Sequence, residues 1–223
     1  MLEVPIVILN VKCYEEATGE GLNRIVDAMS RASADYGVSA AIAVQSSDIS
    51  RASLISRIPV LAQHVDPIGY GSHTGHVLPE AVKFAGAKGS LVNHSERRLE
   101  LWAIDEVVKR LRGLGLTQIV CSNNDDVSRA VAALGPDFVA VEPPELIGGD
   151  ISVSKAKPEV VSSSVSKVRE VSKSTRVLCG AGIKSSDDVS KAIELGADGV
   201  LLASGIVRAH DVYKACEEIF RGV

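Results

Sequence analysis

Gly89-Ser90-Leu91-Val92-Asn93-His94-Ser95-Glu96 and Phe138-Val139-Ala140-Val141-Glu142-Pro143-Pro144 are the two stretches that decide the fold. Each begins with a short apolar run of the kind that forms a buried strand, and each is followed by a loop and a helical pattern. A histidine and a glutamate therefore stand at the carboxyl ends of separate strands and can face one small molecule from different sides. With Asn10 and Lys12 at the end of the first strand, they form a set suited to proton transfer.

The same unit, a strand followed by a helix, recurs along the whole chain. Strands are predicted over residues 6–10, 39–45, 60–64, 89–92, 117–121, 138–141, 176–179 and 199–202. Eight alternations in 223 residues predict a compact α/β protein, a (β/α)8 barrel with residues 1–223 in a single domain. A doubly wound open sheet is the alternative, but it usually carries a GxGxxG turn where this chain has Asn10-Val11-Lys12-Cys13.

Composition and charge narrow the class of protein. Apolar residues make up 46% of the chain and aromatic residues 4%, which suits a buried parallel sheet rich in Val, Ile and Leu. The apolar runs are too short for a membrane span and no signal peptide opens the chain, so we expect a soluble, cytoplasmic protein. The net charge of −4 argues against nucleic acid or a membrane as a partner, but is compatible with an anionic small substrate.

The four cysteines indicate neither a disulfide framework nor a metal site. Cys13, Cys121, Cys179 and Cys216 lie far apart, with no CxxC motif and no histidine partner at metal-ligand spacing. We expect them to be reduced and mostly buried.

In a barrel, the carboxyl ends of the strands surround one mouth. Taken alone, a glutamate, histidine or lysine at a strand end is often a surface, hydrogen-bonded or solvated residue. The convergence of many such residues at one rim is what indicates a site. The residues expected there are Asn10, Lys12, His94, Glu96, Cys121, Glu142, Gly180 and Ser204.

Glu142 begins a segment built like a lid. Pro143 and Pro144 restrict the backbone at its start, and Gly148-Gly149 make its end flexible. The segment can therefore open and close by a defined hinge motion. A carboxylate under such a lid would lose water on closing, which strengthens it as a base. An ordinary proline-rich turn is the alternative.

His94 is expected at the start of a helix through Ser95, Glu96 and Arg97, where the helix dipole disfavours a charged imidazolium. A neutral ring could donate a hydrogen bond to a substrate carbonyl and shuttle protons between oxygens. Lys12 supplies fixed positive charge and is expected to be oriented by Glu96. A Schiff-base role for Lys12 is disfavoured, because a nearby carboxylate stabilises its ammonium form.

Two turns with small residues are expected to bind an anion. Residues 179–183 (Cys-Gly-Ala-Gly-Ile) follow the seventh strand, and residues 202–205 (Leu-Ala-Ser-Gly) follow the eighth. Small side chains let backbone amides approach an anion, and barrels often bind phosphate at this place. The pair predicts a phosphorylated ligand without identifying the reaction.

Together, these motifs resemble the signatures of the triosephosphate isomerase family. Asn10-Val11-Lys12, Asn93-His94-Ser95-Glu96, and Glu142-Pro143 followed by Ile147-Gly148 come in the family's order on strands one, four and six. Gln63 and Thr74-Gly75 also look like family positions, and the similarity covers essentially the whole chain. The resemblance implies reversible isomerisation of D-glyceraldehyde 3-phosphate and dihydroxyacetone phosphate through an enediolate, without a metal or an organic cofactor.

The resemblance also implies a role for each matching residue. Glu142 would remove the proton alpha to the carbonyl and His94 would polarise that carbonyl; this family is itself the standard example of a glutamate base with a neutral histidine. Asn10 and Lys12 would contact the substrate, and Lys12 would also stabilise the enediolate. Ser95 and Glu96 would support this set. The remaining substrate-binding residues would be Ile147, Gly148, Gly182, Ala203 and Ser204.

Some segments depart from the family pattern. Glu145-Leu146 stands where the commoner lid has a tryptophan, and Cys179-Gly180-Ala181-Gly182 replaces Tyr-Gly-Gly-Ser, so the latching of the lid must differ. The short chain looks like the compact archaeal branch, which implies at least a homodimer and leaves a homotetramer open. In the family, the loop that carries Thr74 and Gly75 inserts beside a neighbour's Asn and Lys; a free surface loop is the alternative.

Two other functions remain open. A Schiff-base phosphosugar aldolase would form an adduct at Lys12 that borohydride traps. A phosphometabolite-binding barrel without turnover would fail an isomerisation assay. Both are less favoured, because the chain retains the base and the electrophile.

Overall fold

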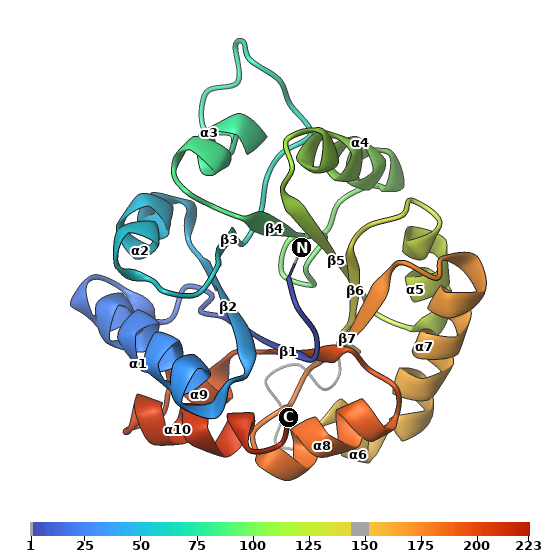
Figure 1. Cartoon of the computed structure of the whole chain (residues 1–223). Coiled ribbons are helices and arrows are strands. Elements are labelled where there is room, and N and C mark those ends of the chain that lie inside the picture. The colour runs from blue at the N-terminus through green and yellow to red at the C-terminus, as the bar shows by residue number, and fades with distance from the viewer. Residues whose placement is uncertain (1, 144–151) are drawn as a thin grey trace.

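The computed structural model describes residues 2–143 and 152–223 of the chain. Eight parallel strands close into a barrel in the order β1-β2-β3-β4-β5-β6-β7-β8, and helices surround them as an outer layer (Figure 1). The strands are β1 (Ile6–Asn10), β2 (Ser39–Val44), β3 (Val60–Ala62), β4 (Gly89–Val92), β5 (Thr117–Ser122), β6 (Phe138–Val141), β7 (Arg176–Gly180) and β8 (Gly199–Leu202). The predicted (β/α)8 barrel is confirmed.

The helices connect successive strands, and short 3-10 turns follow β1 and β2. Within the described residues, every helix is too short or too polar to cross a bilayer. The helices are α1 (Glu20–Tyr36), α2 (Ile49–Ile55), α3 (Pro79–Phe84), α4 (Leu101–Gly113), α5 (Asp125–Ala132), α6 (Val153–Ala156), α7 (Pro158–Val171), α8 (Ser186–Glu194), α9 (Ser204–Val207) and α10 (Val212–Phe220), and the 3-10 helices are η1 (Glu15–Ala17) and η2 (Ser46–Asp48).

Four predicted strand ends need correction by one or two residues. β2 stops before Gln45, because this residue caps η2. β3 stops at Ala62, because its register with β4 ends there. β5 and β7 are each one residue longer than predicted, since Ser122 pairs with Val141 and Gly180 pairs with Leu201. Pairing with neighbouring strands, which a single strand's composition does not reveal, sets the ends of β3, β5 and β7.

Alternation along each strand divides the core into two parts. Ile6 and Ile8 point into the barrel and Val7 and Leu9 point outward against the helices, and all four are fully buried. Phe138, the largest side chain of the inner group, fills the barrel interior. The thiols follow the same division: Cys121 lies inside the barrel, Cys179 and Cys216 lie between strands and helices, and Cys13 is exposed. All four cysteines are free, and three are buried, as predicted.

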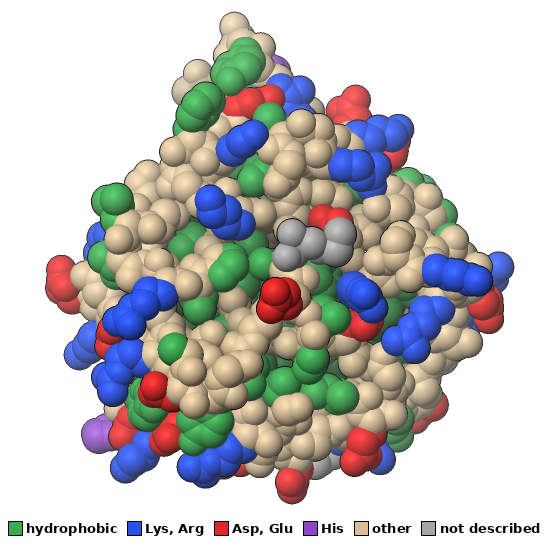
Figure 2. Space-filling view, viewed as in Figure 1, with side chains coloured by type: hydrophobic (Ala, Val, Ile, Leu, Met, Phe, Trp, Pro, Cys, Tyr) green, Lys and Arg blue, Asp and Glu red, His purple; other side chains and the backbone are tan. Residues whose placement is uncertain are grey.

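The segment between β3 and α3 projects away from the barrel (Figure 1). In the space-filling view apolar side chains lie on this projection and also in the centre and lower part of the same face, among scattered acidic and basic groups (Figure 2). Its base is closed by Asp66, whose carboxylate accepts a hydrogen bond from the Val77 amide at 2.6 Å and lies 3.0 Å from His64 Nε2. Thr74 and Gly75 are exposed on this projection, so their predicted contact with a second subunit stays a prediction.

Candidate active site

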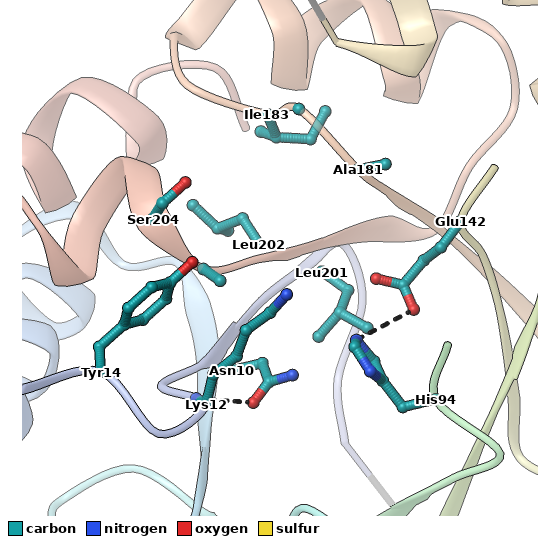
Figure 3. Close-up of a pocket in the computed structure, with 12 residues that line it drawn as sticks. Asn10, Lys12, Tyr14, His94, Glu142, Ala181, Ile183, Leu201, Leu202 and Ser204 are labelled. Carbon is teal, nitrogen blue, oxygen red and sulfur yellow. Dashed lines mark hydrogen bonds and ion pairs between the residues drawn. The ribbon is translucent and has the colours of Figure 1, made fainter. Parts of the chain in front are cut away.

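One cavity gathers residues from the carboxyl ends of β1, β4, β6, β7 and β8. Figure 3 shows Lys12 and Asn10 facing it from one side and His94 and Glu142 from another. Every predicted catalytic or substrate-binding residue that the structure describes is on its wall, while Ile147 and Gly148 lie outside the described residues. The lining residues are Asn10, Lys12, Tyr14, His94, Glu142, Ala181, Gly182, Ile183, Leu201, Leu202, Ala203 and Ser204.

Glu142 and His94 face each other across this cavity. Glu142 follows β6 directly, and its amide donates a hydrogen bond to the Ser122 carbonyl at 2.8 Å, which fixes the start of its side chain. Glu142 Oε2 lies 3.6 Å from His94 Nε2, and each side chain is only 7% exposed. Within residues 2–143 and 152–223, Oε2 accepts no hydrogen bond. The gap is too long for a hydrogen bond, so an acceptor and a ring nitrogen are both available to an atom placed beside them.

The position of the Glu142 side chain depends on the absence of a side chain at Gly180 of β7. A Cβ atom at Gly180 would clash with Glu142 Cγ at 2.4 Å and would lie in tight contact with Oε1 at 3.1 Å. A buried thiol lies beneath the same carboxylate. Burial, and then the negative charge of Glu142, raise the pKa of the Cys121 thiol, so this group stays protonated next to the carboxylate.

The helix predicted through Ser95, Glu96 and Arg97 is wrong. These residues form a turn, and α4 begins only at Leu101. The cause is Asn93, which adopts a left-handed backbone with φ of 60°. Its side chain donates a hydrogen bond to the Cys121 carbonyl at 3.0 Å and accepts one from the Leu99 amide at 2.9 Å. These bonds tie the turn to β5 and delay the helix.

The turn nevertheless determines the tautomer of His94. The Glu96 amide donates a hydrogen bond to His94 Nδ1 at 3.2 Å. Because Nδ1 acts as an acceptor, the ring hydrogen is on Nε2, which faces Glu142 and the cavity. A backbone amide, in place of the expected helix dipole, thus orients the ring so that Nε2 faces the cavity, and the neutral state of His94 stays a prediction.

Lys12 is held in the cavity by three neighbours. Its ammonium group donates a hydrogen bond to Glu96 Oε1 at 2.7 Å, which confirms the predicted pair. Its amide donates to Asn10 Oδ1 at 3.0 Å, and its carbonyl accepts a hydrogen bond from Gln63 Nε2 at 3.0 Å. This ion pair with a carboxylate suits Lys12 to a role as fixed positive charge rather than as a nucleophile.

Backbone strain is concentrated at this mouth. In the described part of the chain, the non-glycine residues with left-handed φ are Lys12 (50°), Asn93 (60°) and Ala181 (72°). Each lies within two residues after a barrel strand, and two of them line the cavity. Such conformations cost about 1–3 kcal/mol each and tend to persist where the surroundings demand a particular shape.

The two predicted anion turns lie side by side. A Cβ atom at Gly205, in the first turn of α9, would come within 3.0 Å of the Ile183 carbonyl of the β7–α8 turn, so the glycine permits close approach. Gly182, Ala203 and Ser204 from these turns line the cavity. Their backbone amides are therefore available to an anion bound between the turns.

A buried carboxylate fixes the β7–α8 turn. Asp188 is 5% exposed, and its Oδ2 accepts hydrogen bonds from the amides of Lys184 and Ser185, both at 3.0 Å. Its Oδ1 accepts a third hydrogen bond, from Ser152 Oγ at 2.8 Å. Ser185 in turn caps α8. Asp188 thus joins the anion turn to the chain that follows residue 151.

Comparison with known proteins agrees with this geometry. The family model described as triosephosphate isomerase matches residues 5–219. The chain belongs to the triosephosphate isomerase family. It is 55% identical to the triosephosphate isomerase of Methanothermus fervidus, covering 98% of each chain. It is 52% identical to that of Methanobacterium bryantii (96% of this chain, 94% of the relative) and 52% identical to that of Archaeoglobus fulgidus (98% of each). It is therefore an isomerase, and the resemblance to the archaeal branch is confirmed.

Several residues at this triosephosphate isomerase mouth were not predicted from the sequence. Tyr14 lines the cavity, and its position two residues after Lys12 on the same turn was a usable signal. Leu201 and Leu202 also line it, although strand-end leucines carry no chemical signal. The hydroxyl of Ser95 is buried and has no hydrogen-bond partner among the described residues, so its supporting role stays a prediction.

Metal-ligating groups do not converge at this site. Among the described residues, no three His, Cys, Asp or Glu side chains are arranged to hold a metal ion. The polar side chains of this triosephosphate isomerase cavity are instead one carboxylate, one imidazole, one ammonium group, the side-chain amide of Asn10, and the hydroxyls of Tyr14 and Ser204.

Proposed function

We propose that the chain interconverts D-glyceraldehyde 3-phosphate and dihydroxyacetone phosphate through an enediolate intermediate. The observation that carries the proposal is the buried pair of Glu142 and His94, with Oε2 and Nε2 3.6 Å apart in one cavity. The names of its relatives in Methanothermus fervidus and Methanobacterium bryantii point to the same substrate.

Glu142 is the base in this proposal. Its carboxylate removes the proton from the carbon next to the carbonyl, and the electron pair of that C–H bond forms the carbon–carbon double bond of the enediolate. His94 passes its Nε2 proton to the carbonyl oxygen, where negative charge develops, and takes up the proton of the adjacent hydroxyl oxygen, so that the ring ends in the state in which it began. Glu142 then returns a proton to the neighbouring carbon, which gives the isomeric triose phosphate. Burial of both side chains keeps competing water away from the intermediate.

Lys12 and the two amide turns supply positive potential. The Lys12 ammonium lies on the cavity wall and offsets the charge of the enediolate, with Asn10 beside it. Gly182, Ala203 and Ser204 are proposed to hold the phosphate through their backbone amides. Ile147 and Gly148 are also expected to bind the phosphate, and they lie outside the described residues.

The assembly proposed is a homodimer at least, with a homotetramer left open. Its support is the projecting loop that carries Thr74 and Gly75, because the loop is exposed while its base is tied by Asp66. Light scattering on the purified chain measures the mass directly. A purely monomeric protein at micromolar concentration would contradict this proposal. The cytoplasmic location expected from the sequence stays a prediction.

A coupled assay tests the reaction. Glyceraldehyde 3-phosphate is supplied, and the dihydroxyacetone phosphate formed is reduced by an NADH-dependent dehydrogenase. We expect turnover by the natural chain and its loss in Glu142→Ala. Turnover that survives Glu142→Ala would refute the role of Glu142, and its absence from the natural chain would favour a binding barrel. An adduct at Lys12 after borohydride treatment with substrate would favour the aldolase chemistry.

A further inference from the structure

Tyr14 places a phenol on the wall of the cavity, across from Glu142. It lies on the turn between β1 and η1, and Figure 3 shows its hydroxyl directed into the cavity, on the side where Lys12 and Ser204 lie. Glu142 and His94 occupy the opposite side. The phenol is therefore placed near the anion turns and away from the base.

Contacts to the backbone of Tyr14 and to its ring both restrict the orientation of this residue. Its carbonyl accepts hydrogen bonds from the Ala17 amide at 3.1 Å and from Thr18 Oγ1 at 3.0 Å, which fixes the backbone. The guanidinium carbon of Arg208 lies 6.0 Å from the ring centroid, and Arg208 is itself 3.6 Å from Glu16. A side chain that is already ordered loses little entropy when it contacts a ligand.

The hydroxyl of Tyr14 has an unused donor. It makes no hydrogen bond to any described residue, whereas the hydroxyl of Tyr36 bonds Glu217 at 2.9 Å and that of Tyr213 bonds Asp35 at 2.6 Å. A phenol O–H is a good donor to a charged oxygen, and such charge-assisted bonds are stronger than neutral ones.

We infer that Tyr14 is a phosphate-binding residue, whose hydroxyl donates a hydrogen bond to a phosphate oxygen of the substrate. The inference rests on the proposed function for the identity of that substrate. The anion lies between the amides of Ala203 and Ser204, and the phenol contacts it from the Lys12 side. Tyr14 therefore contributes to the binding of phosphorylated trioses and not to proton transfer.

The test compares Tyr14→Phe with Tyr36→Phe. Both substitutions remove one phenolic hydroxyl and keep the ring, but Tyr36 lies at the end of α1 and bonds Glu217 of α10, away from the mouth. Calorimetric titration with inorganic phosphate gives Kd for each protein, and steady-state assays give kcat and KM for glyceraldehyde 3-phosphate. Loss of a hydrogen bond to a charged group predicts about a tenfold rise in Kd and in KM for Tyr14→Phe. We expect kcat to change by less than about twofold, and Tyr36→Phe to match the natural chain in all three constants.

Two results would overturn the inference. One is a phosphate Kd that is the same in Tyr14→Phe and the natural chain, or phosphate that fails to bind either. The other is an equal loss of kcat/KM on unphosphorylated D-glyceraldehyde, which would show that the effect is not on phosphate. The titration needs no turnover, so a natural chain that binds phosphate without isomerising would refute the proposed function while still deciding the role of Tyr14.

Discussion

Replacement of Gly180 by alanine should disable the site without unfolding the barrel. Gly180 ends β7, and its backbone does not have the left-handed φ that only glycine tolerates well. An alanine can therefore adopt the same backbone. Its methyl group, however, would stand 2.4 Å from Glu142 Cγ, so the Glu142 side chain, the proposed base, must move.

The size of the effect follows from this distance. An ordinary van der Waals contact begins at 3.4 Å, so Glu142 must shift by the difference, 3.4 − 2.4 = 1.0 Å. Misplacement of a reacting group by about 1 Å lowers the rate about 100-fold. That loss corresponds to about 2.7 kcal/mol of transition-state stabilisation. We expect the loss mainly in kcat, because the substitution leaves in place the backbone amides that are proposed to bind the phosphate.

Gly113→Ala is the matched control. Gly113 ends α4, and nothing lies within 4 Å of a Cβ atom placed there. The coupled isomerase assay should give natural kcat and KM for Gly113→Ala, and a kcat about 100-fold lower with nearly unchanged KM for Gly180→Ala. Circular dichroism should show that both variants keep the fold. Natural turnover in Gly180→Ala would refute the reasoning, since it would mean that the position of Glu142 does not limit the chemistry.

Further predictions address the base, the thiols and the acid stability. Glu142→Asp shortens the side chain by one methylene, so turnover should fall sharply while the Kd for inorganic phosphate stays within about twofold in a calorimetric titration. A thiol reagent at neutral pH should modify one cysteine rapidly, because only Cys13 is exposed, and burial raises the pKa of the three buried thiols. Cys13→Ser should remove that fast phase, and a fast phase that remained would contradict the assignment. Burial alone would raise the pKa of Asp66, but hydrogen bonds from His64 and the Val77 amide outweigh it and hold the pKa below its usual value. The carboxylate therefore stabilises the fold above its unfolded pKa, and this stability is lost as pH falls through the lower, folded pKa. In urea titrations, the unfolding free energy of Asp66→Asn should accordingly decrease less between neutral pH and about pH 3 than that of the natural chain. An equal decrease in both proteins would show that Asp66 does not contribute to the acid sensitivity of the fold.

The barrel and most of its mouth could be predicted because both depend on local pattern. Apolar runs mark the strands, and topology places the residue after each strand at one rim. Glu142, His94 and Lys12 follow their strands directly or within two residues, so each was placed correctly without any knowledge of packing. The Lys12–Glu96 pair was predicted for the same reason, because both residues belong to turns at that rim.

What could not be predicted depends on contacts between distant segments. The turn at His94 replaces the expected helix because Asn93 bonds the Cys121 carbonyl of the next strand. Gly180 is needed because Glu142, from the neighbouring strand, occupies the place of its Cβ atom. The ring of Tyr14 has the guanidinium of Arg208, from near the far end of the chain, 6.0 Å from its centroid. No periodicity in one segment carries this information.

Deuterium exchange during isomerisation tests the central claim most directly. A carboxylate that removes the carbon-bound proton can exchange it with solvent before returning it. With glyceraldehyde 3-phosphate in D2O, the natural chain should therefore yield dihydroxyacetone phosphate that carries deuterium on carbon 1, detected by proton NMR, and Glu142→Gln should yield none. Product that forms at the natural rate without deuterium, or deuterium that enters equally in Glu142→Gln, would contradict proton transfer by Glu142.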